Sequence, residues 1–249
     1  MHTFACKQLL RVDQKTPNSL VYGETGRFPL RVNSAVRAIK YWLQLQNMTN
    51  DRLPKQALNM LSSITVPTEV NWLKNIEDCL CKSGYAFVWY NKGTTNERGF
   101  LKNLKVRLKD IYRQQWSDKI DNSARLMWYK TIKQDFQCEK YLSTLEVMKF
   151  RIALTRFRLR RNELKVKALV EEETLCPFCK NQSEDESHFL LYCYVYTDMR
   201  EKYIGKYIKY MNEAGLDFNF LINGQGYLKT KHVAMYIYQA LKQRRRYLE

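Results

Sequence analysis

Four residues near the last quarter of the chain have the types and spacing of a metal site. Two residues separate Cys176 from Cys179, eight residues then precede His188, and four more precede Cys193. This C-x2-C-x8-H-x4-C pattern predicts one tetrahedral zinc site, because Zn²⁺ favours thiolate and imidazole ligands and residues 188 and 193 can project from one helical face. Four protein ligands fill the coordination shell, so no position remains for a reactive water. We therefore expect Zn²⁺ to be a structural cofactor.

The alternative is a group of unrelated buried thiols near a histidine, since free cysteine often behaves as a small apolar residue. The chain has only 3 His and 7 Cys, and composition alone does not explain ligand spacing among four of them. Cys79 and Cys81 are separated by one residue, too close for a second C-x2-C turn, so we predict no second metal site. An odd number of cysteines without a secretory signal favours a reducing compartment.

The charge of the chain points to an anionic partner. Its formal net charge is +17 at pH 7, and its pI is about 9.5. Charge of this size concerns association rather than fold, and nucleic acid, RNA or DNA, is favoured over an anionic membrane surface. No apolar run approaches the roughly 18 residues of a membrane-spanning helix, and the N-terminus has no signal-peptide pattern. We expect a soluble, intracellular protein with no membrane partner and no small-molecule substrate.

Sparse glycine and proline, together with helical periodicity, predict a mostly α fold: a multi-helix body with a small zinc knuckle near the C-terminus. We predict a helical body over 1–170 and a second region, 171–249, that contains the knuckle and the C-terminal helices. Turn-forming residues predict an irregular segment before residue 30, and the tryptophans are expected in the core. Amphipathic patterns predict helices over 35–46, 53–64, 68–82, 100–119 and 124–136.

A basic helix near 149–167 is the best candidate for contact with an anion. It contains eight basic residues against one acid, Glu163, and arginine donates paired hydrogen bonds to phosphate. The plainer interpretation is a solvated helix face. A second basic cluster lies near the C-terminal end of the chain. The predicted nucleic-acid contacts are Lys149, Arg151, Arg156, Arg158, Arg160, Arg161, Lys165, Lys167, Arg244, Arg245 and Arg246.

Acidic and aromatic residues surround the predicted ligands. Glu184, Asp185 and Glu186 are expected to begin the ligand-bearing helix, where negative charge is favourable. Phe189 and the two leucines after it are expected to fill the space beneath the metal. The tyrosines near Cys193 could stack on bases, although packing against other helices is the commoner role of such tyrosines: Tyr192, Tyr194 and Tyr196.

The knuckle segment resembles the zinc-binding region that follows the polymerase in non-LTR (LINE-type) retrotransposon reverse transcriptases. The similar residues are Leu175-Cys176-Pro177-Phe178-Cys179 and Glu184-Asp185-Glu186-Ser187-His188-Phe189-Leu190-Leu191-Tyr192-Cys193, followed by Tyr196 and Arg200. Softer similarities lie upstream, in Tyr22-Gly23-Glu24-Thr25-Gly26-Arg27-Phe28-Pro29-Leu30, Ile39-Lys40-Tyr41-Trp42 and Leu154-Thr155-Arg156-Phe157-Arg158. The resemblance implies a detached module that holds template RNA or target DNA, and with the basic terminus it favours the nucleus.

Catalytic motifs of that family are missing from the sequence. A reverse transcriptase needs a Tyr-x-Asp-Asp turn, and the associated nuclease is marked by a Pro-Asp step, but the chain contains neither pair. We therefore predict no enzymatic activity and non-specific electrostatic binding of RNA or DNA. The rivals are a helical protein-interaction scaffold stapled by zinc, which the acidic run Glu171-Glu172-Glu173 leaves open, and an inert remnant of a retroelement.

Overall fold

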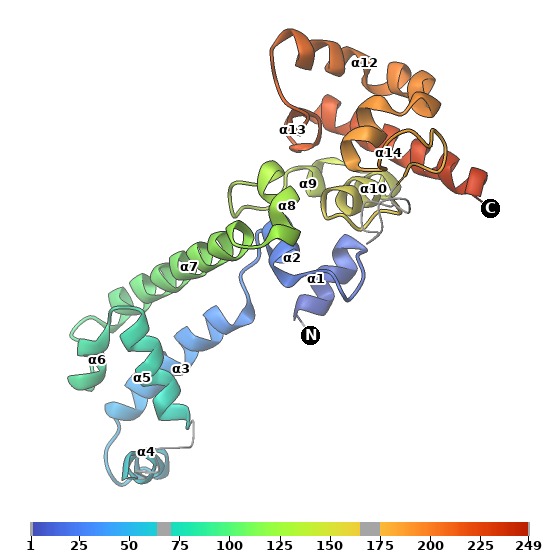
Figure 1. Cartoon of the computed structure of the whole chain (residues 1–249). Helices are drawn as coiled ribbons and strands as arrows, with labels where there is room; N and C mark the ends of the chain where they lie inside the picture. The colour runs from blue at the N-terminus through green and yellow to red at the C-terminus, as the bar shows by residue number, and fades with distance from the viewer. Residues whose placement is uncertain (1, 64–70, 165–174, 249) are drawn as a thin grey trace. The chain divides into compact units, whose positions relative to one another are not determined.

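The mostly α prediction is confirmed by a computed structural model that describes residues 2–63, 71–164 and 175–248 (Figure 1). These residues form helices and connecting turns, with no β-strand among them beyond two isolated bridges. No helix within the described ranges is long and apolar enough to span a membrane. The main α-helices are α1 (His2–Leu10), α2 (Asn18–Thr25), α3 (Leu30–Gln46), α4 (Leu53–Ser63), α5 (Trp72–Lys82), α6 (Ala86–Tyr90), α7 (Glu97–Asp121), α8 (Met127–Ile132), α9 (Tyr141–Thr144), α10 (Met148–Arg158), α12 (Thr197–Glu213), α13 (Asn219–Ile222) and α14 (Tyr227–Leu248).

The prediction of an irregular opening is wrong. Helices α1 and α2 occupy it, and the turn-forming residues lie at helix boundaries instead. Pro17 precedes α2 with φ −54°, a value that suits a helix entry. Gly26 ends α2 in the left-handed conformation with φ +60°, and its Cα is so close to the backbone of Cys138 that a side chain at this position would clash. Proline and glycine therefore bound a helix here without disrupting it.

The chain divides into two compact units, one of 1–27 with 119–249 and one of 28–118. We call these unit 1 and unit 2. Unit 2 is thus inserted within the sequence of unit 1. The boundary predicted between residues 170 and 171 lies outside the described residues and stays a prediction.

Unit 2 has a core formed by α3 to α7. Trp42 is 1% exposed and stacks on Trp89 with ring centroids 5.3 Å apart, so both tryptophans contribute to packing as the sequence predicts. Leu104 of α7 is fully buried in the same cluster. Helix α5 begins after Asn71, whose side chain accepts a hydrogen bond from the Lys74 N–H at 2.8 Å. The apolar stripes predicted for this part of the chain therefore face one shared core.

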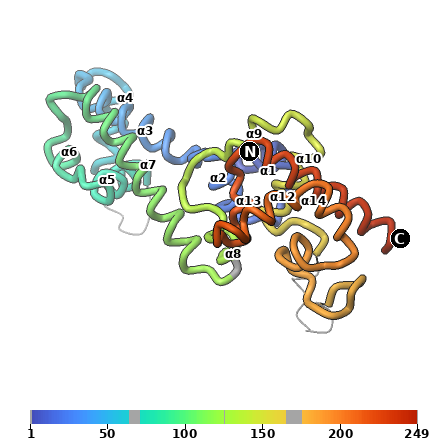
Figure 2. The backbone as a smooth tube through the Cα atoms, turned by 90° about the horizontal axis from the view of Figure 1, so that it is seen from above, coloured from blue at the N-terminus to red at the C-terminus, as the bar shows by residue number. Residues whose placement is uncertain are grey.

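In unit 1, α14 packs against both α10 and α12, and the tube in Figure 2 shows the C-terminal helix passing beside α10. Val233, Ala234 and Ile237 of α14 are fully buried, and the small side chain of Ala234 permits close helix packing. The basic helix is shorter than predicted, because α10 ends at Arg158 and Arg160 turns the chain with φ +49°. The helix predicted over 124–136 likewise ends early, at Ile132 of α8.

A buried ion-pair network lies at the centre of unit 1. Arg158 is fully buried, and its Nε donates to Glu24 Oε1 at 2.7 Å, while its Nη2 lies 3.1 Å from Glu139 Oε2. The hydroxyls of Tyr129 and Tyr141 donate to the same Glu24 carboxylate at 2.8 and 2.6 Å. Arg158 was expected to face solvent and contact phosphate. This expectation is corrected, because the guanidinium joins α2, α10 and the loop after α8.

Charge pairing decides the ionisation of the network. Burial alone would raise the pKa of Glu24, but the Arg158 guanidinium and the two tyrosine hydroxyls hold it below the usual value. Burial raises the pKa of Glu139, and the positive charges of Arg158 and Lys133 oppose this increase only in part. Lys133 Nζ lies 2.5 Å from Glu139 Oε1. Removing the arginine would therefore leave two buried carboxylates with one cation between them.

We expect Arg158→Met to destabilise unit 1 by about 3–5 kcal/mol, because it leaves buried carboxylate charge uncompensated. The free energy of unfolding, measured by urea titration with circular dichroism, checks this. The matched control, Arg246→Met, removes an exposed guanidinium from α14 and should change stability by no more than about 0.5 kcal/mol. Equal stabilities of the two variants would contradict a central role for the network.

Candidate metal centre

The first two predicted ligands lie in a tight backbone turn. The Cys176 N–H donates to Gln182 O at 2.9 Å, and the Lys180 N–H donates to Cys176 O at 2.9 Å. Lys180 has φ +54°, in the left-handed region that a lysine adopts only with some strain. An isolated antiparallel bridge between Leu175 and Ser183 closes the base of this turn. The turn therefore places the thiols of Cys176 and Cys179 close together.

The other two ligands come from a wide helical turn, η3 (His188–Tyr192). Asp185 begins it, since its Oδ1 accepts from the His188 N–H at 2.6 Å and from Ser187 Oγ at 2.8 Å. The Cys193 N–H donates to His188 O at 2.8 Å, a hydrogen bond between residues five apart. In a regular α-helix residues five apart point about 140° away from each other, so the wider π turn is what brings these two ligands together.

The four ligand atoms form a compact cluster. All lie within 4.8 Å of one another, with Cys176 Sγ 3.9 Å from Cys193 Sγ and Cys179 Sγ 3.4 Å from His188 Nε2. A tetrahedral ion with bonds of about 2.3 Å to sulfur and about 2.05 Å to nitrogen would separate such pairs by about 3.8 and 3.6 Å. The cluster could therefore hold one metal ion, and its Cys₃His donor set is consistent with zinc.

The surroundings of the four side chains shift their pKa values in different directions. Burial, and the neighbouring Cys176 thiol, raise the pKa of Cys193 to about 12. Burial also opposes ionisation of Cys179, but the backbone N–H groups of Asn181 and Gln182 and the neighbouring thiols hold its pKa below the usual value. Burial lowers the pKa of His188, which favours the neutral imidazole that a metal needs. A bound cation would reverse the cost of ionising the buried thiols and release their protons.

The side chain of Gln182 contacts His188, a contact that the sequence pattern does not indicate. Its Oε1 lies 3.0 Å from His188 Nδ1, so a proton on Nδ1 is donated to the amide and Nε2 is left to face Cys179. Such a contact fixes the tautomer and the ring orientation of a ligating histidine. A glutamine in a turn has many roles, and only the folded arrangement shows this one.

The wide turn is anchored from behind by α12 and α14. Arg200 of α12 donates from Nε to Leu190 O at 2.8 Å and from Nη2 to Cys193 O at 2.6 Å. Tyr236 of α14 donates its hydroxyl to Phe189 O at 2.7 Å. Phe189 and Leu190 are fully buried, as predicted for residues beneath the metal. The ligand positions are thus set by the C-terminal helices as well as by the knuckle.

Several of the predicted nucleic-acid contacts are used inside the fold. Arg244 is buried and pairs with Glu184 through two hydrogen bonds of 2.8 and 2.7 Å. The prediction that it contacts nucleic acid is therefore corrected. Arg160 pairs with the buried Glu186 at 3.1 Å. These two pairs also give the acidic residues of the knuckle a function. Glu184 and Glu186 tie it to α14 and to the segment after α10.

The other predicted contacts are distributed between internal and exposed positions. Arg151 donates to carbonyl groups of the α9 region, and Arg156 donates to Arg11 O. Arg161 lies 3.7 Å from Asp13, and Arg245 pairs with Glu163 on the surface. Lys149 and Arg246 are exposed, and Lys165 and Lys167 lie outside the described residues. The structure therefore does not gather the predicted arginines into one outward-facing row.

The tyrosines near Cys193 divide into two groups. Tyr196 is 2% exposed and packs against Phe189 with ring centroids 5.1 Å apart, in agreement with the packing role. Tyr192 and Tyr194 are each 64% exposed. Only these two are available to a partner.

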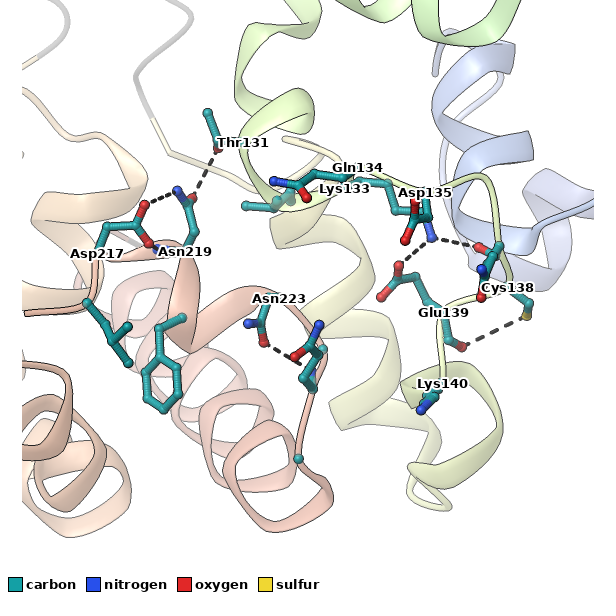
Figure 3. Close-up of a pocket in the computed structure, with 17 residues that line it drawn as sticks. Thr131, Lys133, Gln134, Asp135, Cys138, Glu139, Lys140, Asp217, Asn219 and Asn223 are labelled. Carbon is teal, nitrogen blue, oxygen red and sulfur yellow. Dashed lines mark hydrogen bonds and ion pairs between the residues drawn. The ribbon is translucent and has the colours of Figure 1, made fainter. Parts of the chain in front are cut away.

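A separate cavity of 630 Å³ lies in unit 1 between the loop after α8 and the residues around α13 (Figure 3). Its polar groups largely bond to one another. Asn219 Nδ2 donates to Asp217 Oδ2 at 2.9 Å, and Thr131 Oγ1 donates to Asn219 Oδ1 at 3.1 Å. No histidine lines it. We therefore assign it no chemistry.

Comparisons with protein-family models, with curated proteins and with solved structures find no match for this chain. The class of site is therefore defined by its own residues: a closed Cys₃His cluster that could hold a metal ion in a mostly helical, strongly basic protein.

We expect Cys193→Ser to abolish stoichiometric metal binding, because it removes a buried thiolate ligand. Native mass spectrometry after loading with Zn²⁺ and dialysis measures the ion retained. Cys81→Ser is the matched control, since it changes an exposed thiol and should retain one ion. Retention of one tightly bound ion by Cys193→Ser would contradict the assigned ligand set.

We expect Gln182→Ala to weaken metal binding by about 10- to 100-fold, because His188 loses the acceptor that orients it. Competition with a chromophoric chelator measures the affinity. Gln182→Glu keeps an acceptor at this position and should retain the wild-type affinity. An alanine variant that binds as tightly as the wild type would show that Gln182 does not orient the ligand.

Proposed function

We propose that this chain is a zinc-binding, nucleic-acid-binding module, similar to the region after the polymerase in LINE-type reverse transcriptases, that holds the backbone of RNA or DNA without sequence preference. The net charge of +17 carries this proposal. A polyanion releases its condensed counterions when such a protein binds, which makes association favourable and strongly dependent on salt. The nucleus is the proposed location, from the same resemblance and the basic C-terminal end.

Zinc is the proposed ion because three cysteines and one histidine provide soft and borderline ligands at tetrahedral spacing. The four side chains fill the shell, so the ion has a structural role and the module has no catalytic one. Zinc binding supplies about 10–16 kcal/mol in small zinc peptides, and part of that energy would stabilise the knuckle. Arg200, Arg244 and Tyr236 link the knuckle to α12 and α14, so the metal would also fix the ends of these helices.

Two of the arginines predicted to contact nucleic acid are buried and unavailable for binding. Arg158 and Arg244 neutralise internal carboxylates, whereas Lys149, Arg156 and Arg246 remain exposed near α10 and α14. Exposed cations contact phosphates at little cost in desolvation, and non-specific dissociation constants of this type are about 10⁻⁴ to 10⁻⁶ M at physiological salt.

A zinc-stapled helical scaffold for a protein partner is the second candidate function. Ion pairs within the chain favour it, because Arg160 and Arg245 are paired with Glu186 and Glu163 and are therefore less available to an external anion. An inert retroelement remnant is the third possibility. Neither alternative requires binding to a polyanion, which separates both from the main proposal.

The test is fluorescence anisotropy of the zinc-loaded chain with a structured RNA, a single-stranded DNA and a duplex DNA, each at several salt concentrations. We expect micromolar or tighter binding at low salt that falls steeply as salt rises. A neutral polysaccharide is the control competitor and should displace nothing. No binding at low salt would overturn the proposal and leave the scaffold or the remnant.

A further inference from the structure

Helix α7 has a row of basic residues along one face in unit 2. Arg98, Lys102, Lys105, Lys109 and Arg113 follow one another at spacings of four, three, four and four residues. At 100° per residue they fall within an arc of about 80°, and at 1.5 Å per residue they extend over about 22 Å. We call these five residues the α7 row.

The first part of the row has no acidic residue between its cations that could neutralise their charge. From Arg98 to Lys109 the helix contains no acidic residue, so each cation of the row has another cation one turn away. Like charges at this spacing destabilise a helix. Arg98, Lys102 and Lys105 are exposed, and none of them makes a hydrogen bond or ion pair within the described ranges. A bound anion would relieve this repulsion without breaking an existing contact.

The second part of the row is held in place by aromatic rings. Lys109 Nζ and Arg113 Cζ each lie 5.2 Å from the centroid of the Phe28 ring. A further cation, Arg31, has its Cζ 5.6 Å from the ring of Tyr112, which precedes Arg113 in the chain. A ring orders a cation but does not neutralise it. Apart from the 2.5 Å pair between Arg113 and Asp110, the charge is thus positioned and still available.

The opposite face of α7 makes the row rigid. Phe100 and Leu104 are buried in the core of unit 2 together with Trp42. Gly99 N–H donates to Asn96 Oδ1 at 2.9 Å, which caps the start of the helix. The cations therefore project from a fixed support, so a strand that binds them does not have to order the backbone beneath.

From these observations we infer that the α7 row is the main phosphate-contacting surface of the molecule, with a nucleic-acid backbone lying along the helix. This inference rests on the proposed function and gives it a location different from the one predicted on α10. About 22 Å of duplex carries about six phosphates per strand, enough for five cations. The row consists of cations, and the Phe28 ring beside it already contacts two of them, so the row suits phosphates rather than bases and should not distinguish sequences.

The test compares two triple variants that each remove three exposed lysine or arginine charges. Arg98→Gln with Lys102→Gln and Lys105→Gln neutralises the first part of the row. Lys202→Gln with Lys206→Gln and Lys209→Gln is the matched control on α12, where Glu201 and Glu213 flank the three lysines and Lys209 pairs with Glu213 at 4.0 Å. Binding of labelled duplex DNA and of the same single strand, both of mixed sequence, is followed by anisotropy across a series of salt concentrations.

We expect the row variant to bind at least 10-fold more weakly at physiological salt. Its slope of log affinity against log salt should decrease by about 2 to 3, since each lost phosphate contact removes about 0.7 to 0.9. The control should change the slope by less than about 1. Helicity and thermal midpoint of the row variant should equal or exceed those of the wild type, because the removed groups are exposed and repel each other.

The outcomes separate the inference from the function on which it rests. If the wild type binds no nucleic acid, the proposed function fails. If the wild type binds and the row variant keeps its slope, the function stands and the inference is overturned. Equal losses in both triple variants would also overturn it, because they would show a diffuse effect of net charge with no preferred surface.

Discussion

Unit 1 depends on the need to pair a buried guanidinium. An arginine cannot be taken out of water alone, and Arg158 is fully buried, so carboxylates must converge on it from elsewhere in the chain. Glu24 arrives from α2 and Glu139 from the loop after α8, and the carbonyl of Ile222 accepts a further hydrogen bond at the end of α13. One side chain thus fixes the mutual positions of four segments. The helix that carries Arg158, α10, also packs on α14, and Tyr236 of α14 supports the candidate metal centre.

The mostly α fold class and the clustering of four Cys and His side chains could be predicted because they depend on local patterns. Helical periodicity needs only neighbouring residues, and the spacing of Cys176, Cys179, His188 and Cys193 is written in one short segment. The roles of the arginines could not be predicted in this way. Arg158 and Glu24 are separated by 134 residues, and no local property of a basic helix shows that a distant acid will bury one of its members. The π turn and the Gln182 contact likewise have no sequence signature.

The basic residues of unit 1 and unit 2 differ in the contacts that they make. In unit 1, Arg200 and Arg244 use their charge to hold backbone and carboxylate groups around the knuckle. In unit 2, Lys102 and Lys105 are exposed and make no hydrogen bond or ion pair with the residues that the structure describes. The basic residues behind the high net charge therefore fall into two groups. Some cations stabilise the fold, and others are exposed on its surface.

The insertion of unit 2 between residues 27 and 119 has a consequence for how the protein is made. A ribosome releases α1 and α2 first, but the partners of Glu24 emerge more than a hundred residues later. The whole of 28–118 is available before then and can complete its own core while the N-terminal segment waits. Early folding of the insert would bring its two ends to fixed positions, which shortens the effective loop that unit 1 must close. Folding would then proceed from the middle of the chain outward, although synthesis runs from the N-terminus.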